Sequence, residues 1–371
     1  MNSSHSLRRL AILAPGYGIT PRGIESVVAE LSMRLCSQWH IDIYTMGPAS
    51  TGNPACIHVP GIRSTSQLAL WYARLGHRLR RWWKLRSPID FQSLTYSVNL
   101  LPRILRQTYS AILNLSGPFG GFVCQLKRNL DGTPFIHSSQ GQSIGWLELM
   151  HADQHPDYFF ALTQPGFDWI CRERPALRTA LVPNGVDVER YHPDVPPVTL
   201  NLPRPIFLFV GALTPMKRPD LAIEAVASLE RGSLVMIGDG EQRKQIVEQG
   251  VKRLGKDRFL HIPFIAQEFM PAHYAACDVF TLPSPDEPFG VVFLEAMACN
   301  KPVVAHHGRV QKWLVGHAGN LCDCAMLGAY SVALERATLS EWNMKPRSRA
   351  VHFSWDLIAD QYHTYLETLD K

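Results

Sequence analysis

The sequence predicts an α/β protein built from two doubly wound domains of similar size with a cleft between them. Short apolar segments alternate with helical stretches along the whole chain, which is typical of parallel sheets covered by helices. The chain has 371 residues, 46% hydrophobic and 19% charged, an ordinary globular composition at a length that favours two domains. A proline-rich, loosely patterned stretch at 193–205 interrupts the alternation, and we interpret it as the interdomain linker.

The first half of the chain contains seven candidate strands, each a short apolar run bounded by turn residues. Helical patterns fill the gaps, for example at Ile24–Cys36, where Val27, Val28, Leu31 and Leu35 share one face. The predicted strands are Leu10–Ala14, Ile41–Thr45, Ile57–Val59, Ala111–Leu115, Phe135–His137, Tyr158–Leu162 and Ala180–Val182.

The second half restarts the same alternation and ends in an amphipathic helix at Trp355–Leu369, with Ile358, Tyr362 and Tyr365 at helical spacing. We therefore expect a first domain at 1–192, a second at 193–352 and a C-terminal helical segment at 353–371. The predicted strands of the second half are Ile206–Val210, Leu234–Ile237, Phe259–Ile262, Val279–Leu282 and Pro302–Ala305.

The net charge of +5 is unevenly distributed. Between Ile43 and Leu130 the only acidic residue is Asp90, against eleven lysines and arginines, so this segment carries +10 and the remainder −5. Such asymmetry indicates an anionic partner for the amino-terminal half.

The cysteines and the amino terminus favour a cytoplasmic protein. None of the eight cysteines forms a CxxC pair, and Cys322 and Cys324 are too close together and too isolated to predict a zinc site. Arg8 and Arg9 precede an apolar run too short for a signal peptide. No stretch approaches the ~20 apolar residues that a membrane-spanning helix needs.

Two glutamates eight residues apart, Glu287 and Glu295, are the most informative feature of the chain. Glu287 follows the predicted strand Val279–Leu282 in a proline-rich loop, at the edge where open α/β sheets bind ligands. Glu295 lies about one turn into the predicted helix Val291–Cys299, whose start offers unpaired N–H groups to a phosphate. The pattern indicates a sugar nucleotide; the alternative is a solvated loop glutamate and a surface helical one.

Further candidates lie at the ends of other predicted strands. Lys217 and Arg218 begin a helix after Ile206–Val210, and because the helix dipole disfavours cations there, we favour phosphate binding over solvated side chains. Gly23, between the first strand and helix, would let backbone N–H groups approach a diphosphate. His137 closes a strand and could position a substrate hydroxyl, although a lone histidine is equally often structural.

The segment at 67–86 combines an apolar helical face with basic side chains, which is typical of a helix lying in a headgroup layer. Each basic residue near an anionic surface would contribute up to ~1 kcal/mol. The alternative is that the apolar face covers the amino-terminal sheet. The candidate membrane-surface residues are Trp71, Arg74, Arg78, Arg81 and Trp82.

Together these motifs resemble the retaining GT-B glycosyltransferases of the family 4 type. The run from Glu287-Pro-Phe-Gly to Glu295-Ala-Met-Ala looks like that family's two-glutamate motif, Val182-Pro-Asn-Gly-Val-Asp187 is similar to its interdomain signature, and Phe353-Ser-Trp-Asp356 to its carboxyl-terminal pattern. The resemblance covers essentially the whole chain, with little contribution from 43–130. It implies two Rossmann-like domains facing a central cleft, with the last helix returning to the first domain.

The resemblance also implies a hexosyltransferase that needs no metal and no cofactor, with a nucleotide-diphosphate sugar as co-substrate. Glu287 would contact donor-sugar hydroxyls, Glu295 the ribose, and His137 would lie beside the sugar. Lys217 would neutralise the leaving diphosphate, where preorganised charge is most effective. The remaining donor contacts would come from Gly23, Arg218, Ile265, Phe289, Gly290 and Val291.

We expect the acceptor to be a lipid-linked or envelope polysaccharide hydroxyl presented at an anionic membrane surface, and we expect no nucleic-acid partner. Three departures from the family pattern matter: Ala212 in place of an arginine, Arg22 in place of a first glycine, and Asn300 in place of a turn glycine. Two alternatives stay open. One is a GT-B sugar-nucleotide epimerase or phosphorylase, and the other, motivated by Ala212, is a degenerate sugar-nucleotide-binding subunit without turnover.

Overall fold

The structure is a computed structural model that describes residues 7–19, 23–74, 87–141 and 144–369. It divides into two compact units, which are described separately: unit 1 comprises Met1–Pro183 with Ile358–Lys371, and unit 2 comprises Asn184–Leu357. Within the described residues, no helix combines the length and the apolar character that a membrane crossing requires.

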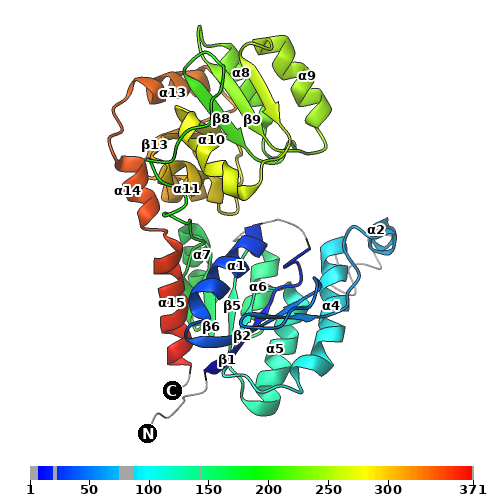
Figure 1. The fold of residues 1–371 in the computed structure, drawn as a ribbon. Helices are drawn as coiled ribbons and strands as arrows, with labels where there is room; N and C mark the ends of the chain where they lie inside the picture. The colour runs from blue at the N-terminus through cyan, green and yellow to red at the C-terminus, as the bar shows by residue number, and fades with distance from the viewer. Residues whose placement is uncertain (1–6, 20–22, 75–86, 142–143, 370–371) are drawn as a thin grey trace. The chain divides into compact units, whose positions relative to one another are not determined.

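Unit 1 contains a seven-stranded sheet in the order β3-β2-β1-β4-β5-β6-β7 (Figure 1). Every neighbouring pair is parallel, as the alternation of strands and helices predicts. The strands are β1 (Arg8–Leu13), β2 (Trp39–Thr45), β3 (Ala55–His58), β4 (Ala111–Asn114), β5 (Phe135–Ser138), β6 (Tyr158–Ala161) and β7 (Thr179–Leu181).

The helices of unit 1 lie on both faces of this sheet (Figure 1). Their termini follow from local chemistry: Ser87 and Asp90 form a capping box at the start of α4, and Gly132, with φ of 80°, ends α5. The helices are α1 (Gly23–Leu35), α2 (Gln67–Arg74), α4 (Pro88–Ile104), α5 (Pro118–Asp131), α6 (Trp146–Ala152), α7 (Gln164–Glu173) and α15 (Trp355–Thr368).

Helix α15 joins unit 1 through its aromatic face. The Tyr362 hydroxyl lies 2.7 Å from Ser138 Oγ, and the Tyr365 ring packs 5.0 Å from that of Tyr158. The helix therefore covers the β5–β6 part of the sheet, and it accounts for the amphipathic pattern in the last residues of the sequence.

Unit 2 contains a six-stranded parallel sheet in the order β10-β9-β8-β11-β12-β13. The strands are β8 (Ile206–Val210), β9 (Ser233–Ile237), β10 (Phe259–Ile262), β11 (Val279–Leu282), β12 (Val303–His306) and β13 (Gly319–Cys322). The helices are α8 (Pro219–Ala227), α9 (Arg243–Leu254), η1 (Gln267–Phe269), α10 (Met270–Ala276), α11 (Val291–Ala298), α12 (Arg309–Val315), α13 (Leu327–Leu339) and α14 (Lys345–Val351).

The predicted strands are confirmed, each within two residues at either end, and β13 is additional. The units divide after Pro183 and before Ile358, whereas the sequence placed the first division after residue 192 and the second after 352. The reason is a backbone pairing: Val186 N–H donates to Phe353 O at 2.8 Å, and Trp355 N–H donates to Val186 O at 3.1 Å. These bonds hold the segment after Pro183 to the end of unit 2.

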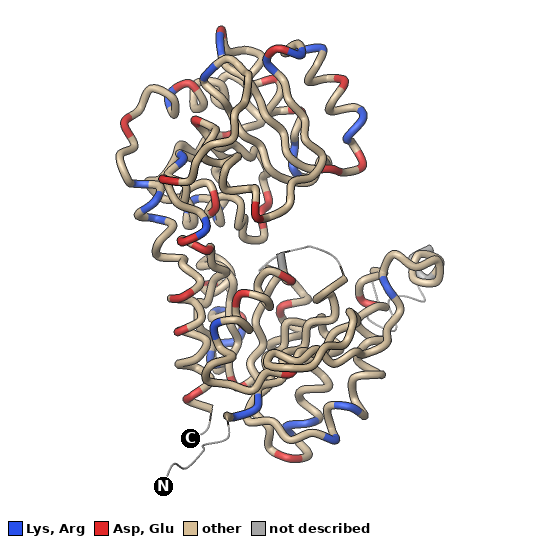
Figure 2. Tube along the Cα trace, in the orientation of Figure 1, with Lys and Arg blue, Asp and Glu red and all other residues tan. Residues whose placement is uncertain are grey.

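Both sheets reverse their winding direction at a central pair of strands, β1 and β4 in unit 1 and β8 and β11 in unit 2. Loops leave opposite sides of the sheet at such a switch point, so a crevice for ligands opens at the carboxyl ends of these strands. Figure 2 shows lysine and arginine positions on the α4 and α5 part of unit 1. Five of the eleven basic residues at 43–130 fall within 75–86, outside the described residues.

Candidate active site

The loops after β8 and β11 bring Lys217 and Glu287 into direct contact in unit 2. Lys217 Nζ lies 2.6 Å from Glu287 Oε1 and 2.8 Å from Oε2, so the ammonium donates to both carboxylate oxygens. The Glu287 side chain is only 4% exposed and the Lys217 side chain 19%. The carboxyl ends of two adjacent parallel strands thus carry a nearly enclosed ion pair, and these are two of the residues that the sequence predicts for this edge.

Helix α11 begins immediately after this pair. Gly290 precedes it with φ of 92°, and a Cβ there would lie 2.5 Å from the Phe293 ring, so the position requires glycine. The Phe289 side chain is buried and packs edge-on against Trp313 and Phe353, which anchors the loop. No side chain caps the helix start at Val291, which leaves its first N–H groups suited to an anion.

Glu295 lies in α11, one turn beyond Gly290, and has a different environment from Glu287. Its Oε2 accepts a hydrogen bond from the Tyr274 hydroxyl at 2.6 Å. Burial raises the pKa of Glu295 above its ordinary value, although the bond from Tyr274 acts in the opposite direction. Tyr191 and the Arg190 charge also lower the pKa of this carboxyl group, and sequence reasoning gave no sign of Tyr274.

Arg218 and Ile265 lie on two different loops of unit 2, after β8 and after β10. Arg218 takes a left-handed conformation, with φ of 51°, directly before α8, and Ile265 is partly buried in the loop after β10. Ala212, which replaces the expected arginine, is exposed just after β8. The structure thus places these donor-site candidates on loops at the carboxyl ends of β8 and β10.

The pair Cys322 and Cys324 is not isolated, contrary to the sequence interpretation. Their sulfur atoms lie 3.7 Å apart, and the Cys324 N–H donates to His306 Nδ1 at 3.4 Å. Ligand atoms of His306, His307 and Asp323 lie within 4.8 Å of one another. Burial and His307 lower the pKa of His306, and the Arg218 charge acts in the same direction. The carboxylates of Asp323 and Asp286 act in the opposite direction.

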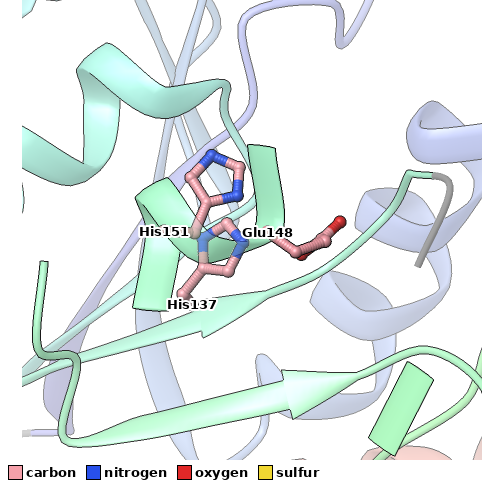
Figure 3. A group of neighbouring side chains, drawn as sticks. All are labelled: His137, Glu148 and His151. Atoms are coloured by element: carbon pink, nitrogen blue, oxygen red, sulfur yellow. The ribbon is translucent and has the colours of Figure 1, made fainter. Parts of the chain in front are cut away.

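Unit 1 holds a buried polar cluster around His137, in β5 (Figure 3). The rings of His137 and His151 lie with their centroids 3.9 Å apart and their planes tilted by 38°, and Glu148 lies beside them. All three side chains are at most 5% exposed, and their ligand atoms lie within 4.8 Å of one another. Asn114, the last residue of β4, contacts His137 Nδ1 at 3.2 Å.

The cluster strongly perturbs its titrating groups. Burial lowers the pKa of His137 well below its usual value and that of His151 to about 3, and it raises the pKa of Glu148 to about 7. The sequence indicated only His137. The spacing of Glu148 and His151, three residues apart on one helix, was the available signal for the other two.

The remaining candidates lie at the limits of the described residues. Gly23 starts α1 as expected, and Arg22 falls outside the described residues. Trp71 lies on α2 and is 58% exposed, and Arg74 is the last residue of that helix. Arg78, Arg81 and Trp82 lie outside the described residues.

Two parallel sheets covered by helices, each with a central switch point, are the architecture of the GT-B glycosyltransferases. The family described as Glycosyl transferases group 1 matches residues 194–345. The D-inositol 3-phosphate glycosyltransferase of Rhodococcus opacus is 32% identical, with 95% of this chain and 89% of that protein covered. The chain belongs to this glycosyltransferase family.

Other relatives match over a shorter range. The D-inositol 3-phosphate glycosyltransferase of Geodermatophilus obscurus is 33% identical over 49% of this chain, and the match spans only 46% of that protein's length. Among solved structures, sucrose-phosphate synthase from Thermosynechococcus elongatus has a TM-score of 0.78 at 20% identity, covering 98% of this chain and 99% of that one. Anabaena HepE, in complex with UDP and glucose, has a TM-score of 0.70 at 16% identity, covering 97% and 100%.

Proposed function

We propose that this protein is a retaining, metal-independent glycosyltransferase. It moves a hexose from a nucleotide-diphosphate donor to a hydroxyl group of a lipid-linked or envelope polysaccharide acceptor. The observation that carries the proposal is the Lys217–Glu287 ion pair beside the start of α11. The glycosyltransferase relatives and the UDP and glucose bound to HepE support it.

The ion pair suits a donor because binding can exchange its partners without leaving a charge unpaired. The diphosphate takes the Lys217 ammonium and the first N–H groups of α11, and the sugar hydroxyls donate to the freed Glu287 carboxylate. Each buried charge therefore keeps a partner when the donor enters. Since Ala212 supplies no cation, Lys217 and Arg218 provide the positive charge at the diphosphate.

The chemical step breaks the bond between the anomeric carbon and the diphosphate oxygen. Negative charge grows on that oxygen, so the Lys217 ammonium stabilises the transition state more than the ground state. The acceptor hydroxyl attacks from the face that the diphosphate leaves, which retains the anomeric configuration. Its proton passes to the departing phosphate oxygen, and the products are the glycosylated acceptor and the nucleoside diphosphate.

Donor turnover tests this function. The full chain is incubated with a panel of UDP-, GDP- and ADP-hexoses, and release of the nucleoside diphosphate is measured. Glu287→Ala should abolish release while its circular dichroism stays that of the wild type, and the matched control Glu268→Ala, an exposed glutamate of unit 2, should keep full activity. Wild-type turnover by Glu287→Ala would refute the assignment. Unchanged turnover in EDTA tests metal independence. An anomeric proton coupling in the product that matches that of the donor tests retention of configuration.

The acceptor side is proposed to work at an anionic membrane surface, with the protein peripheral at its cytoplasmic face. The exposed Leu68 and Trp71 on α2, next to the basic segment at 75–86, support this proposal. Leu68→Ala should reduce flotation with anionic liposomes, whereas replacement of Leu339, an even more exposed leucine of unit 2, by alanine should not. Absence of co-migration, or flotation that survives replacement of Arg78 and Arg81, would exclude membrane binding.

A further inference from the structure

The cluster of His137, Glu148 and His151 contains buried polar atoms without a hydrogen-bond partner among the described residues. These atoms are His137 Nε2, both ring nitrogens of His151, and Glu148 Oε2. Buried polar atoms in folded proteins are nearly always paired, so several orphaned atoms facing one another indicate a bound group.

Two kinds of group fit the residue types. A divalent metal ion would use two imidazole nitrogens and a carboxylate, and the ligand atoms lie within 4.8 Å of one another. A hydroxyl group would instead accept a hydrogen bond from one side chain and donate one to another. The two binding modes place different requirements on one atom, His137 Nε2. A metal ion needs a lone pair on this nitrogen, whereas a hydroxyl oxygen that accepts from it needs a hydrogen there.

The hydrogen bonds of Asn114 decide between them. The backbone N–H of Ser116 lies 3.1 Å from Asn114 Oδ1, and Ser116 Oγ lies 2.6 Å from it. A backbone N–H can only donate, so this side of the amide must be the oxygen. The NH₂ group therefore faces His137 Nδ1, at 3.2 Å, and Nδ1 must accept. In a neutral ring the hydrogen then sits on Nε2.

We infer that Asn114 is a positioning residue that fixes His137 as an Nε2–H donor, so that the cluster binds a hydroxyl group of the sugar substrate and not a metal ion. The hydroxyl oxygen accepts from His137 Nε2–H, and its hydrogen is donated to Glu148 Oε2. Ser139 Oγ already donates to the other Glu148 oxygen at 2.9 Å, which leaves Oε2 available. The substrate part of this inference rests on the proposed function, and the tautomer does not.

The tautomer is read directly by long-range ¹⁵N–¹H correlation spectra of the full-length protein labelled at histidine, with His137→Gln used to assign the signals. Wild-type His137 should show a protonated Nε2 and an unprotonated Nδ1. Asn114→Asp, in which both oxygens accept, should reverse this pattern. Asn99→Asp makes the same change of charge on α4 and should leave His137 unchanged. A protonated Nδ1 or an imidazolium in the wild type would overturn the inference.

A metal titration tests the claim that the cluster does not bind a metal ion. One equivalent of Zn²⁺ should leave the His137 and His151 signals of the wild type in place. A shift of both signals that saturates at one equivalent would show a metal site and overturn the inference.

Transfer kinetics separate this inference from the proposed function. Asn114→Asp should lower kcat/KM at least about 10-fold, because the substrate hydroxyl loses its donor, while Asn99→Asp stays at the wild-type value. A protein with the expected tautomer and no transferase activity would refute only the proposed function. An active transferase with Nδ1 protonated would refute only the role of Asn114.

Discussion

The Lys217–Glu287 pair predicts an asymmetry between two single substitutions. The Glu287 side chain is 4% exposed and accepts from Lys217 Nζ at 2.6 and 2.8 Å, whereas the lysine is 19% exposed. Lys217→Met leaves a carboxylate without its cation in a site nearly closed to water, which should cost about 3–5 kcal/mol of unfolding free energy. Glu287→Gln leaves an ammonium that water can reach and an amide oxygen that still accepts, so about 1–2 kcal/mol is expected.

The assay is urea unfolding of the full chain, monitored by hydrogen exchange in peptides that contain β11. The measured free energy is then that of unit 2. The double variant should cost less than the sum of the two single variants, because the second substitution removes the charge that the first one left unpaired. The exposed pair Arg243–Asp239, 3.4 Å apart, is the matched control, and breaking it should cost no more than about 1 kcal/mol. The reasoning would be refuted if Lys217→Met and Glu287→Gln lowered the unfolding free energy equally. It would also be refuted if Lys217→Met lowered it less than the control variant does.

Three further predictions follow from the same contacts. Burial raises the pKa of Glu148 from 4.5 to about 7, so between these pH values the folded state keeps a proton that the unfolded chain releases. The unfolding free energy of the wild type should therefore fall by roughly 3 kcal/mol as the pH rises from 4.5 to 7, and Glu148→Gln should abolish this fall. A difference between the two proteins that does not change with pH would contradict this. Tyr274→Phe should raise KM for the donor with little change in kcat, since it removes the 2.6 Å bond that orients Glu295, and steady-state kinetics would show it. Gly290→Ala should destabilise unit 2 by about 1–3 kcal/mol and abolish nucleotide binding in calorimetry, because φ is 92° there and the Phe293 ring occupies the Cβ position.

The sequence was a good guide to the sheets and to the first carboxylate. Strands such as Val279–Leu282 are short and apolar, with Asp278 before and Pro283 after, and in a parallel sheet such strands place their carboxyl ends on one edge. That rule places Lys217 and Glu287 on the same side of unit 2 without any knowledge of their contact. Strand β13 escaped prediction because Gly319–Cys322 is only partly buried and lacks β-branched residues.

The polar clusters could not be predicted in the same way. Asn114, His137 and Glu148 come from three different elements, and only the register of β4 against β5, which pairs Asn114 with His137, brings two of them together. A period-2 or period-3.6 pattern reports which face a residue occupies and says nothing about the hydrogen-bond partner across the sheet. Sequence reasoning therefore found the histidine and missed the residue that sets its tautomer.

The environments of the two glutamates give one motif two different chemical roles. Glu287 faces a cation, so its charge is balanced before the donor arrives, and substrate hydroxyls must compete with an ammonium for its oxygens. Glu295 accepts from the Tyr274 hydroxyl, and its burial raises its pKa even though Tyr274, Tyr191 and the Arg190 charge act in the opposite direction. Two additional hydroxyl donors, such as those of a ribose, would stabilise the charged form of Glu295. Donor binding should therefore lower the pKa of Glu295, whereas at Glu287 it exchanges one partner for another.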